Sequence, residues 1–334
     1  MNDSLRLFST EADYDSAKPD FVYPTVSYVE GGNRVFYMTK PSILDLPIKA
    51  VFYDSSTGTF VKLYPGQITE VNPNYTPIGV EVVPAEHNVY GTGQAGIMSL
   101  AEMNRSTPDV GSKSYQEINW GGYGTDNSLP YYNKINLVNG TTSSYGYLPS
   151  DQFTGATSLD GVSKYATTSD NAPSPFNADG SRNEAYYTTA YSTANALSDF
   201  DGVGNTAVLT ELATAQGDWK TASTISDSYT VGYYPAACCC WRFHTPGTEQ
   251  GQWYLPAYGE MGYVINRISA INETINKILS VYSSVVAVAV DTVGRYWPST
   301  EHRAYNACRL DVDNGRFFNY GKNFGCNVRA FFRL

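Results

Sequence analysis

Apolar residues recur at alternating spacings of three and four between residues 256 and 282. The series opens on Pro256, a residue favoured in the first turn of a helix, and Glu260 lies near the positive end of the helix dipole. The apolar positions are Met261, Val264, Ile268, Ile271, Ile275, Ile278 and Tyr282. This pattern predicts one long amphipathic helix packed on a sheet. The same spacing fits a heptad repeat, so a self-associating coiled coil is the alternative.

Alternating apolar and polar positions predict strands before this helix. Segments 48–53 and 59–64 alternate on either side of the turn-forming residues 54–58, which indicates a hairpin. Residues 77–84 form a further short strand bounded by prolines. The sequence therefore predicts a small β module over residues 46–85.

Further elements follow in the last third of the chain. Segment 285–290 is an apolar run typical of a buried strand, and 295–297 and 328–332 are further strand candidates. Two shorter helices are expected, one over 205–217, opening on an Asn that can cap it, and one over 236–243. Helices and strands together place the chain in the α+β class.

Two long segments show neither the helical spacing nor the alternation of a strand. Residues 1–45 are punctuated by Tyr and Pro and are predicted to form an extended arm. Residues 105–200 are rich in Gly, Ser, Thr, Asn and Tyr. Because disordered chains are depleted of aromatic residues, we expect an ordered insertion there rather than a linker.

Composition and charge narrow the class of protein. Charged residues make up only 16%, while Tyr and Gly supply 28 and 29 positions, a mix that suits β-rich, loop-rich extracellular or virion proteins. The net charge of −10 argues against binding to nucleic acid. Residues 295–334 nevertheless carry a net charge of +4, which would attract an anionic partner or be neutralised internally.

The chain start and the cysteines indicate where the protein is made. The N-terminus has no secretory signal, and no segment is long and apolar enough to span a bilayer, so synthesis in a cytoplasm is expected. The five cysteines include three consecutive ones, Cys238, Cys239 and Cys240, and no pair has CxxC spacing. All five are expected to be reduced and structural.

A series of short motifs carries a resemblance to a known family. The motifs are Asn205-Thr206, Tyr234-Pro235-Ala236-Ala237 with Cys240, Trp253-Tyr254-Leu255-Pro256-Ala257-Tyr258-Gly259-Glu260, Tyr296-Trp297-Pro298-Ser299-Thr300-Glu301 and Val328-Arg329-Ala330. In this order and spacing, residues 200–334 resemble the C-type-lectin-like domains related to formylglycine-generating enzymes. Within that group they are most similar to the variable proteins of diversity-generating retroelements. Residues 1–104 resemble virion fibre proteins of tailed phages from gut bacteria.

The resemblance implies a C-type-lectin-like domain over residues 86–334, with 105–200 as an insertion and 302–327 as a variable binding segment. Retroelement mutagenesis replaces template adenines, so AAC or AAT codons cannot come to encode Lys, Glu, Gln, Met or Trp. Within 302–327 only Lys322 belongs to that set, against 39 such residues in the rest of the chain. The five Asn of the segment fit unmutated template codons, and they also fit ordinary turns.

The candidate ligand-binding residues are rigid aromatics, Arg forks and adaptable amides in this segment. They are His302, Arg303, Tyr305, Asn306, Arg309, Arg316, Phe318, Asn319, Tyr320, Asn323 and Phe324. About half of them are expected to pack or cap turns instead. Six of them are expected to share one exposed face, with Trp297 and Val328 beneath it: Tyr305, Asn306, Asn319, Tyr320, Asn323 and Phe324.

Catalytic and metal chemistry find little support. Formylglycine-generating enzymes use a closely spaced cysteine pair, whereas Cys308 and Cys326 lie 18 positions apart. The run 311–315 has the wrong register for a calcium loop, and the three His have no ligand spacing. We therefore expect no catalytic residue, metal or cofactor, although sequence alone does not exclude a glycosidase with paired carboxylates.

The sequence thus predicts a phage virion fibre or head-decoration protein that adheres to a host surface polysaccharide or protein. Its expected partners also include other virion proteins and copies of itself, with a trimer favoured, but neither nucleic acid nor a membrane. The alternative is a purely structural virion assembly protein with no host ligand.

Overall fold

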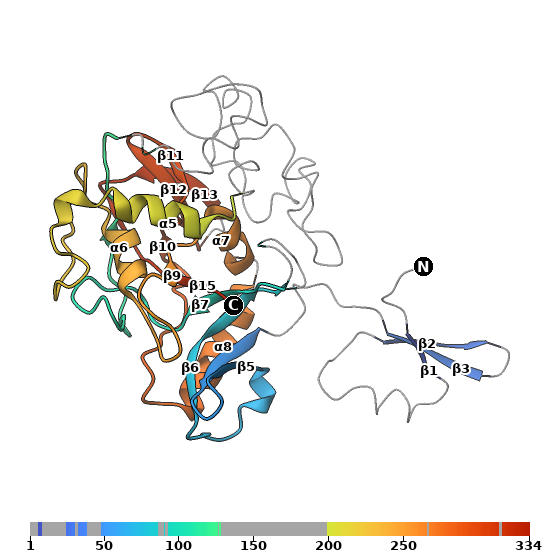
Figure 1. Cartoon of the computed structure of the whole chain (residues 1–334). Helices are drawn as coiled ribbons and strands as arrows, with labels where there is room; N and C mark the ends of the chain where they lie inside the picture. Colours follow the sequence, from blue (N-terminus) through green and yellow to red (C-terminus); the bar gives the residue numbers. More distant parts are fainter. Residues whose placement is uncertain are drawn as a thin grey trace, which may run out of the picture. The chain divides into compact units, whose positions relative to one another are not determined.

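The computed structural model describes residues 6–8, 25–30, 33–38, 48–85, 90, 93–125, 127, 199–265, 267–313 and 316–334 (Figure 1). At the described positions of 6–38, 302–303 and 316–319 the structure describes only the backbone. The chain divides into two compact units, residues 1–47 with 176–182 and residues 48–175 with 183–334. Most of the predicted insertion at 105–200 lies outside the described residues.

The first unit contains a three-stranded antiparallel sheet. Its strands are β1 (Arg6–Phe8), β2 (Thr25–Glu30) and β3 (Asn33–Met38), in the order β1-β3-β2. The expectation of an extended arm over 1–45 is therefore wrong for these residues. Gly31-Gly32 stands between β2 and β3 in the sequence, and a Gly-Gly pair between two strand-forming runs is a known signal of a two-residue hairpin.

The second unit is built on a six-stranded sheet in which every pairing is antiparallel. Its order is β5-β4-β6-β7-β15-β9. The bounds are β4 (Lys49–Asp54), β5 (Thr59–Leu63), β6 (Tyr75–Val83), β7 (Gly96–Ser99), β9 (Trp253–Tyr254) and β15 (Phe331–Arg333). The predicted hairpin and the strand at 77–84 are confirmed. A separate module over 46–85 is wrong, because β6 pairs with β7 and so continues the same sheet.

Four α-helices lie in the described part of the second unit: α5 (Gly202–Glu211), α6 (Pro235–Arg242), α7 (Tyr258–Ile265) and α8 (Ile268–Val281). Two 3₁₀ turns, η2 (Pro65–Gln67) and η6 (Thr214–Gln216), accompany them. The single helix predicted over 256–282 is therefore two helices. Arg267 interrupts it with φ −130° and ψ 18°, and its buried guanidinium donates to the Val82 carbonyl at 3.3 Å.

Helix α8 packs on the sheet as predicted, in preference to the coiled-coil alternative. Ile271, Ile275 and Ile278 on its apolar face are fully buried. Thr274 Oγ1 donates to the Ile48 carbonyl at 3.1 Å, and Tyr282 at the helix end lies 5.4 Å from Phe52 of β4 between ring centroids. The three–four spacing thus reports contact with a sheet rather than with a second copy of the helix.

Helix α5 begins differently from the sequence expectation. Asp201 caps it by accepting a hydrogen bond from the Gly204 amide at 3.1 Å. Asn205 is buried inside the helix, where its amide donates to Asp199 Oδ2 and to Ser299 Oγ. The Asn therefore ties the helix to the segment before β11 instead of capping it.

The strand predicted over 285–290 is wrong, since this segment has no ladder pairing. Two of its carbonyl groups, those of Val288 and Ala289, accept hydrogen bonds from the Arg329 guanidinium at 2.8 and 3.1 Å. Arg329 is itself fully buried and paired with Glu102 at 2.8 Å. A buried cation thus satisfies carbonyl groups that a strand would have paired with a neighbour.

A second sheet carries the C-terminal segment. Its strands are β10 (Arg295–Tyr296), β11 (Glu301–Arg303), β12 (Asn306–Asp311) and β13 (Arg316–Gly321). Strand β12 is central, with β13 on one side and β10 and β11 on the other. A two-stranded ladder joins β8 (Ile118–Asn119) to β14 (Gly325–Cys326). The chain therefore belongs to the α+β class, as predicted.

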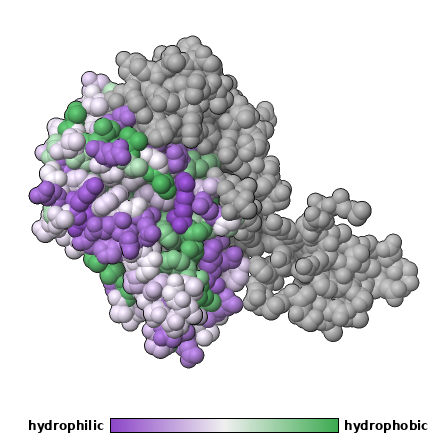
Figure 2. Space-filling model, in the orientation of Figure 1, coloured by the Kyte–Doolittle hydropathy of each residue, from purple (hydrophilic) through white to green (hydrophobic). Residues whose placement is uncertain are grey.

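All five cysteines are buried, free thiols, as expected. Cys238, Cys239 and Cys240 lie on α6 within the main core. No helix in the described residues is long and apolar enough to cross a bilayer. Hydrophilic and weakly polar residues cover most of the coloured surface in Figure 2, and hydrophobic residues appear there in small groups.

Candidate functional site

The predicted binding segment, 302–327, forms most of the second sheet. His302 and Arg303 lie in β11; Tyr305 in the following turn; Asn306 and Arg309 in β12; Arg316, Phe318, Asn319 and Tyr320 in β13; and Asn323 and Phe324 in the turn before β14. The structure describes only the backbone for five of them: His302, Arg303, Arg316, Phe318 and Asn319. The geometry of the site therefore rests on the other six.

Two tryptophans fix the backbone beneath the segment. Trp297 and Trp120 are buried, and their indole N–H groups donate to the carbonyls of Ile118 and Pro298, each at 2.9 Å. Val328 is fully buried, and its carbonyl accepts from the Met103 amide at 2.9 Å. The expectation that Trp297 and Val328 form the buried support is confirmed.

Lys322 belongs to this support. Its ammonium is fully buried, pairs with the buried Glu301 carboxylate, donates to the Thr125 carbonyl at 2.9 Å and lies 4.8 Å from the Trp120 ring. Asn127 donates its amide to the same carboxylate at 2.7 Å. The one residue of 302–327 that adenine mutagenesis of Asn codons could not produce is therefore a structural cation.

Arg309 was expected to contact ligand, but its surroundings are mostly protein. It is only 7% exposed, its guanidinium donates to Asp311 Oδ2 at 2.8 Å, and it lies 3.9 Å above the Tyr320 ring. Burial raises the pKa of Asp311, and the neighbouring Arg309 opposes that rise. Arg309 holds Tyr320 in place, so its assignment as an exposed ligand contact is corrected.

The local excess of positive charge is therefore largely neutralised inside the fold. Lys322, Arg309 and Arg329 are all buried and paired with carboxylates. Of the two explanations left open by the sequence, internal neutralisation is the one these residues support. An anionic partner is not needed to balance them.

The most exposed members of the predicted set are aromatic. Tyr305 is 54% exposed and Phe324 is 48% exposed. Phe324 stacks on Tyr320 with 4.7 Å between ring centroids, and Tyr320 lies 6.0 Å from Trp297. Phe324 and Tyr320, the aromatic pair, thus connect the surface to the buried support.

Tyr305 lies at the edge of a second group, which the sequence did not predict. Its ring meets that of Tyr123 edge-on at 5.1 Å, and Tyr123 meets Tyr229 edge-on at 6.0 Å. We call these three residues the aromatic cluster. All three are more than a third exposed. Tyr305 of segment 302–327 is therefore exposed beside two aromatic residues from distant parts of the sequence.

A glycine-rich turn, residues 121–124, positions Tyr123. Gly121 has φ +95°, and a Cβ on it would approach the Tyr233 carbonyl oxygen to 2.0 Å. The Tyr123 amide donates to the Tyr229 carbonyl at 2.8 Å, which joins the two cluster members through their backbones. The Gly-Gly-Tyr-Gly run was the available sequence signal, but it does not reveal which residues the tyrosine meets.

The expectation that six residues share one exposed face is wrong. In the register of β12 and β13, Ala307 is paired with Tyr320, whereas Asn306 is paired with Gly321. Because successive strand residues alternate between faces, Asn306 falls on the face opposite Tyr320. Asn319 is paired with Cys308, so by the same alternation its backbone position belongs to the face that holds Asn306. Asn306 and Asn323 are half-buried.

The cysteine pair considered for catalysis is part of the core. Cys308 and Cys326 are fully buried. Burial raises the pKa of the Cys326 thiol, the opposite of the shift that activates a cysteine nucleophile. Within the part of the chain that the structure describes, His, Cys, Asp and Glu side chains nowhere gather in a group of three or more that could hold a metal ion.

Comparisons with known proteins give one similarity. No protein-family model matches the chain, and no curated protein shows a significant match. A solved structure of a fimbrial protein from Bacteroides ovatus is similar, with a TM-score of 0.41 and 14% sequence identity. The match covers 93% of this chain and 65% of the fimbrial protein, so this chain spans less than two thirds of that protein's length. A similarity of this size supports no argument about function.

Proposed function

We propose that this chain is a bacteriophage virion fibre or head-decoration protein that adheres to a glycan or protein on the host cell surface. The main support for this proposal is that Tyr305 and Phe324 are exposed on one segment whose supporting residues are fully buried. Rigid aromatic side chains supply contact area at little conformational entropy cost, and they are enriched at binding surfaces. A buried support under exposed aromatics is the arrangement that an adhesive surface requires.

We further propose that residues 86–334 adopt the C-type-lectin-like fold that the motif series resembles. In support, motif residues hold the fold together instead of decorating its surface. Trp253, Leu255 and Trp297 are fully buried. Glu260 accepts hydrogen bonds from the Tyr254 hydroxyl at 2.7 Å and the Ala257 amide at 2.5 Å, within one motif.

The first unit is proposed to attach the protein to the virion or to sister chains. Its sheet ends in two edge strands, β1 and β2, among the residues described. Edge strands can accept an added strand from another chain. Deletion of residues 1–45 should abolish incorporation into particles, and unchanged incorporation would show that the attachment lies elsewhere.

The adhesive role is tested with the double variant Tyr305→Ala/Phe324→Ala. Both residues are exposed, so the melting temperature should stay close to that of the wild type, while adsorption to host cells is lost. A double variant of exposed valines outside the segment, Val71→Ala/Val203→Ala, is the matched control and should adsorb normally. Full adsorption by a folded Tyr305→Ala/Phe324→Ala protein would contradict the proposal.

Neighbouring DNA distinguishes adhesion from the alternative of pure virion assembly. An imperfect repeat of the sequence encoding 302–327, close to a reverse transcriptase gene, would support diversification of the segment. Diversification has a purpose in ligand binding but none in a fixed assembly contact.

A further inference from the structure

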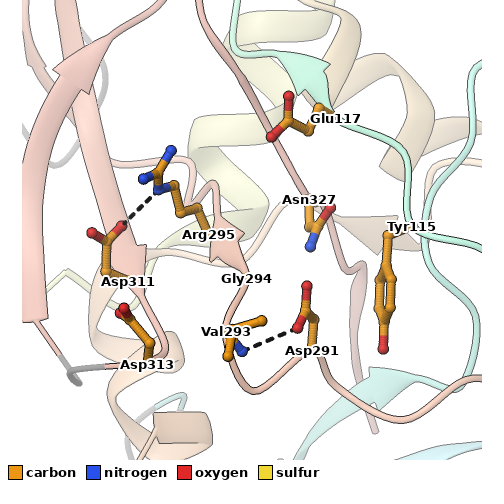
Figure 3. A pocket seen from close by; sticks show the side chains of 9 residues that line it. All are labelled: Tyr115, Glu117, Asp291, Val293, Gly294, Arg295, Asp311, Asp313 and Asn327. Atoms are coloured by element: carbon orange, nitrogen blue, oxygen red, sulfur yellow. Dashed lines mark hydrogen bonds and ion pairs between the residues drawn. The ribbon is translucent and has the colours of Figure 1, made fainter.

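A polar pocket of about 330 Å³ opens beside the second sheet, apart from the aromatic cluster (Figure 3). Asp311 at the end of β12 and Arg295 of β10 form one side, and Tyr115 and Glu117 approach from the segment before β8. Asp291, Asp313 and Asn327 complete its polar lining. The volume lies at the lower end of the range for small-ligand pockets, which corresponds to a single ring rather than a chain.

The side-chain amide of Asn327 is the feature of the pocket that indicates a ligand. The residue is only 5% exposed, and its backbone is fully engaged: its amide donates to the Arg295 carbonyl at 2.8 Å and its carbonyl accepts from the Trp297 amide at 3.1 Å. Its side-chain amide makes no hydrogen bond with the described residues and lies in the pocket (Figure 3). Because its backbone is fixed by these bonds, the side chain presents one N–H₂ donor and one carbonyl acceptor to whatever enters the pocket.

Neighbouring residues keep space open in front of this amide. A Cβ on Gly294 would lie 2.8 Å from Asn327 Nδ2 and 2.6 Å from Asp291 Oδ2, so a side chain there would displace both groups. Asp291 Oδ1 accepts from the Val293 amide at 3.0 Å, which fixes that carboxylate. The Asp291 carboxylate is therefore held in place before any ligand arrives.

The charge of the lining selects the class of ligand. Four carboxylates face the pocket against one cation, Arg295, so an anionic ligand would be repelled. Asp311 is already paired with Arg309 at 2.7 Å and lies 3.9 Å from Arg295. The pocket thus offers carboxylates as acceptors, a guanidinium as a donor and an amide as both.

Hydroxyl groups match this set because each can donate to a carboxylate and accept from an amide or guanidinium. Tyr115 adds an apolar surface: its ring is at the wall, the residue is 43% exposed, and its hydroxyl is fixed by donating to the Ala289 carbonyl at 2.8 Å. A ligand with many hydroxyls on one side and C–H groups on the other meets both requirements.

We propose that this pocket binds one neutral sugar residue of a surface glycan. The inference rests on the proposed adhesive function for the source of the glycan, and it places the sugar contact in a cavity distinct from the aromatic cluster. The aromatic cluster would then add contact area at a place separate from the sugar-binding pocket.

The test titrates the purified full-length protein with D-glucose, D-galactose, D-mannose, L-rhamnose and N-acetylglucosamine, monitored by saturation-transfer NMR and calorimetry. At least one sugar should bind. Tyr115→Ala and Asn327→Leu should each weaken that binding about tenfold or more, since each removes one recognised contact. Tyr115 is exposed, so its variant remains informative if Asn327→Leu fails to fold. Glu249→Gln, an exposed carboxylate outside the pocket, is the control.

Three outcomes would overturn the inference: no sugar binds, a sugar binds equally well to the folded pocket variants, or calcium or free lysine binds at these residues and no sugar does. Free sugars report on the pocket independently of host cells. Sugar binding that the pocket variants lose upholds the pocket even if the Tyr305→Ala/Phe324→Ala protein still adsorbs. If no sugar binds but adsorption still depends on Tyr305 and Phe324, the proposed sugar pocket is wrong and the proposed adhesive role stands.

Discussion

At the scale of single residues, the pair formed by Lys322 and Glu301 belongs to the buried support of segment 302–327. Both side chains are fully buried, and the cation also lies against the Trp120 ring. Removing one partner from such a pair leaves an uncompensated charge in a medium that solvates it poorly. The pair therefore restricts substitution at Lys322 while Tyr305 and Phe324, at the surface, are free to change.

Lys322→Met should lower the free energy of unfolding by about 3–5 kcal/mol, because it leaves the Glu301 carboxylate buried without its cation. The double variant Glu301→Gln/Lys322→Met should recover much of that loss, since no buried charge remains. Denaturant unfolding of the three proteins measures both effects. A double variant less stable than Lys322→Met would show that the pair is not the source of the effect.

Trp297→Ala should lower stability by about 3–5 kcal/mol, because a fully buried indole and its hydrogen bond to Ile118 are lost. Phe324→Ala, a change of similar type at an exposed position, should stay within about 0.5 kcal/mol of wild type. Thermal unfolding of both compares the support with the surface. Equal losses would contradict the division between them.

At the scale of elements, hydrophobic spacing predicted the helical regions and the strands β4, β5, β6, β10 and β15, but not β11, β12 and β13, whose residues were expected to form loops. It could not predict the break before α8, since the apolar series continues through Ile268 and the residue at the break, Arg267, contacts Val82 from a distant part of the sequence. The exposure of the aromatics Tyr305 and Phe324 was predicted. Tyr123 and Tyr229 were missed, because nothing local records which residues meet across the fold.

Gly121→Ala should destabilise the protein by more than 1 kcal/mol and displace Tyr123, since both φ +95° and the nearby Tyr233 carbonyl oppose a side chain. Gly58→Ala is the matched control: it also has positive φ, +72°, but no atom lies within 4 Å of the added Cβ. The difference between the two unfolding free energies isolates the steric part. Equal losses in unfolding free energy would show that the turn adjusts to the added Cβ with no measurable steric penalty.

At the scale of the whole molecule, two buried carboxyl groups make stability depend on pH. Burial raises the pKa of Glu260 to about 7 and that of Asp199 to about 6, although hydrogen bonds to each carboxylate oppose the rise. Each group therefore keeps its proton in the folded state at a pH where the unfolded chain has lost it. Stability from this source is complete below about pH 4 and is lost as the pH rises through these pKa values.

The denaturant midpoint should therefore fall between about pH 4.5 and 7, and Glu260→Gln should flatten that fall because its side chain cannot ionise. Glu211→Gln, the same change at an exposed position, should leave the profile unchanged. Unfolding curves collected across this range give the comparison. A Glu260→Gln profile as steep as that of the wild type would assign the pH dependence to other groups.

The position of β15 in the six-stranded sheet has a consequence for biosynthesis. This strand lies between β7 and β9, and its pairing joins Phe331 to Met98. During translation β4, β5, β6 and β7 emerge early, but the sheet stays open at β7 until residues 331–333 leave the ribosome. Closing so long a loop is slow, and an uncovered strand can meanwhile pair with another nascent chain. Ribosome stalling or early termination anywhere after β7 should therefore yield aggregates rather than a smaller folded protein.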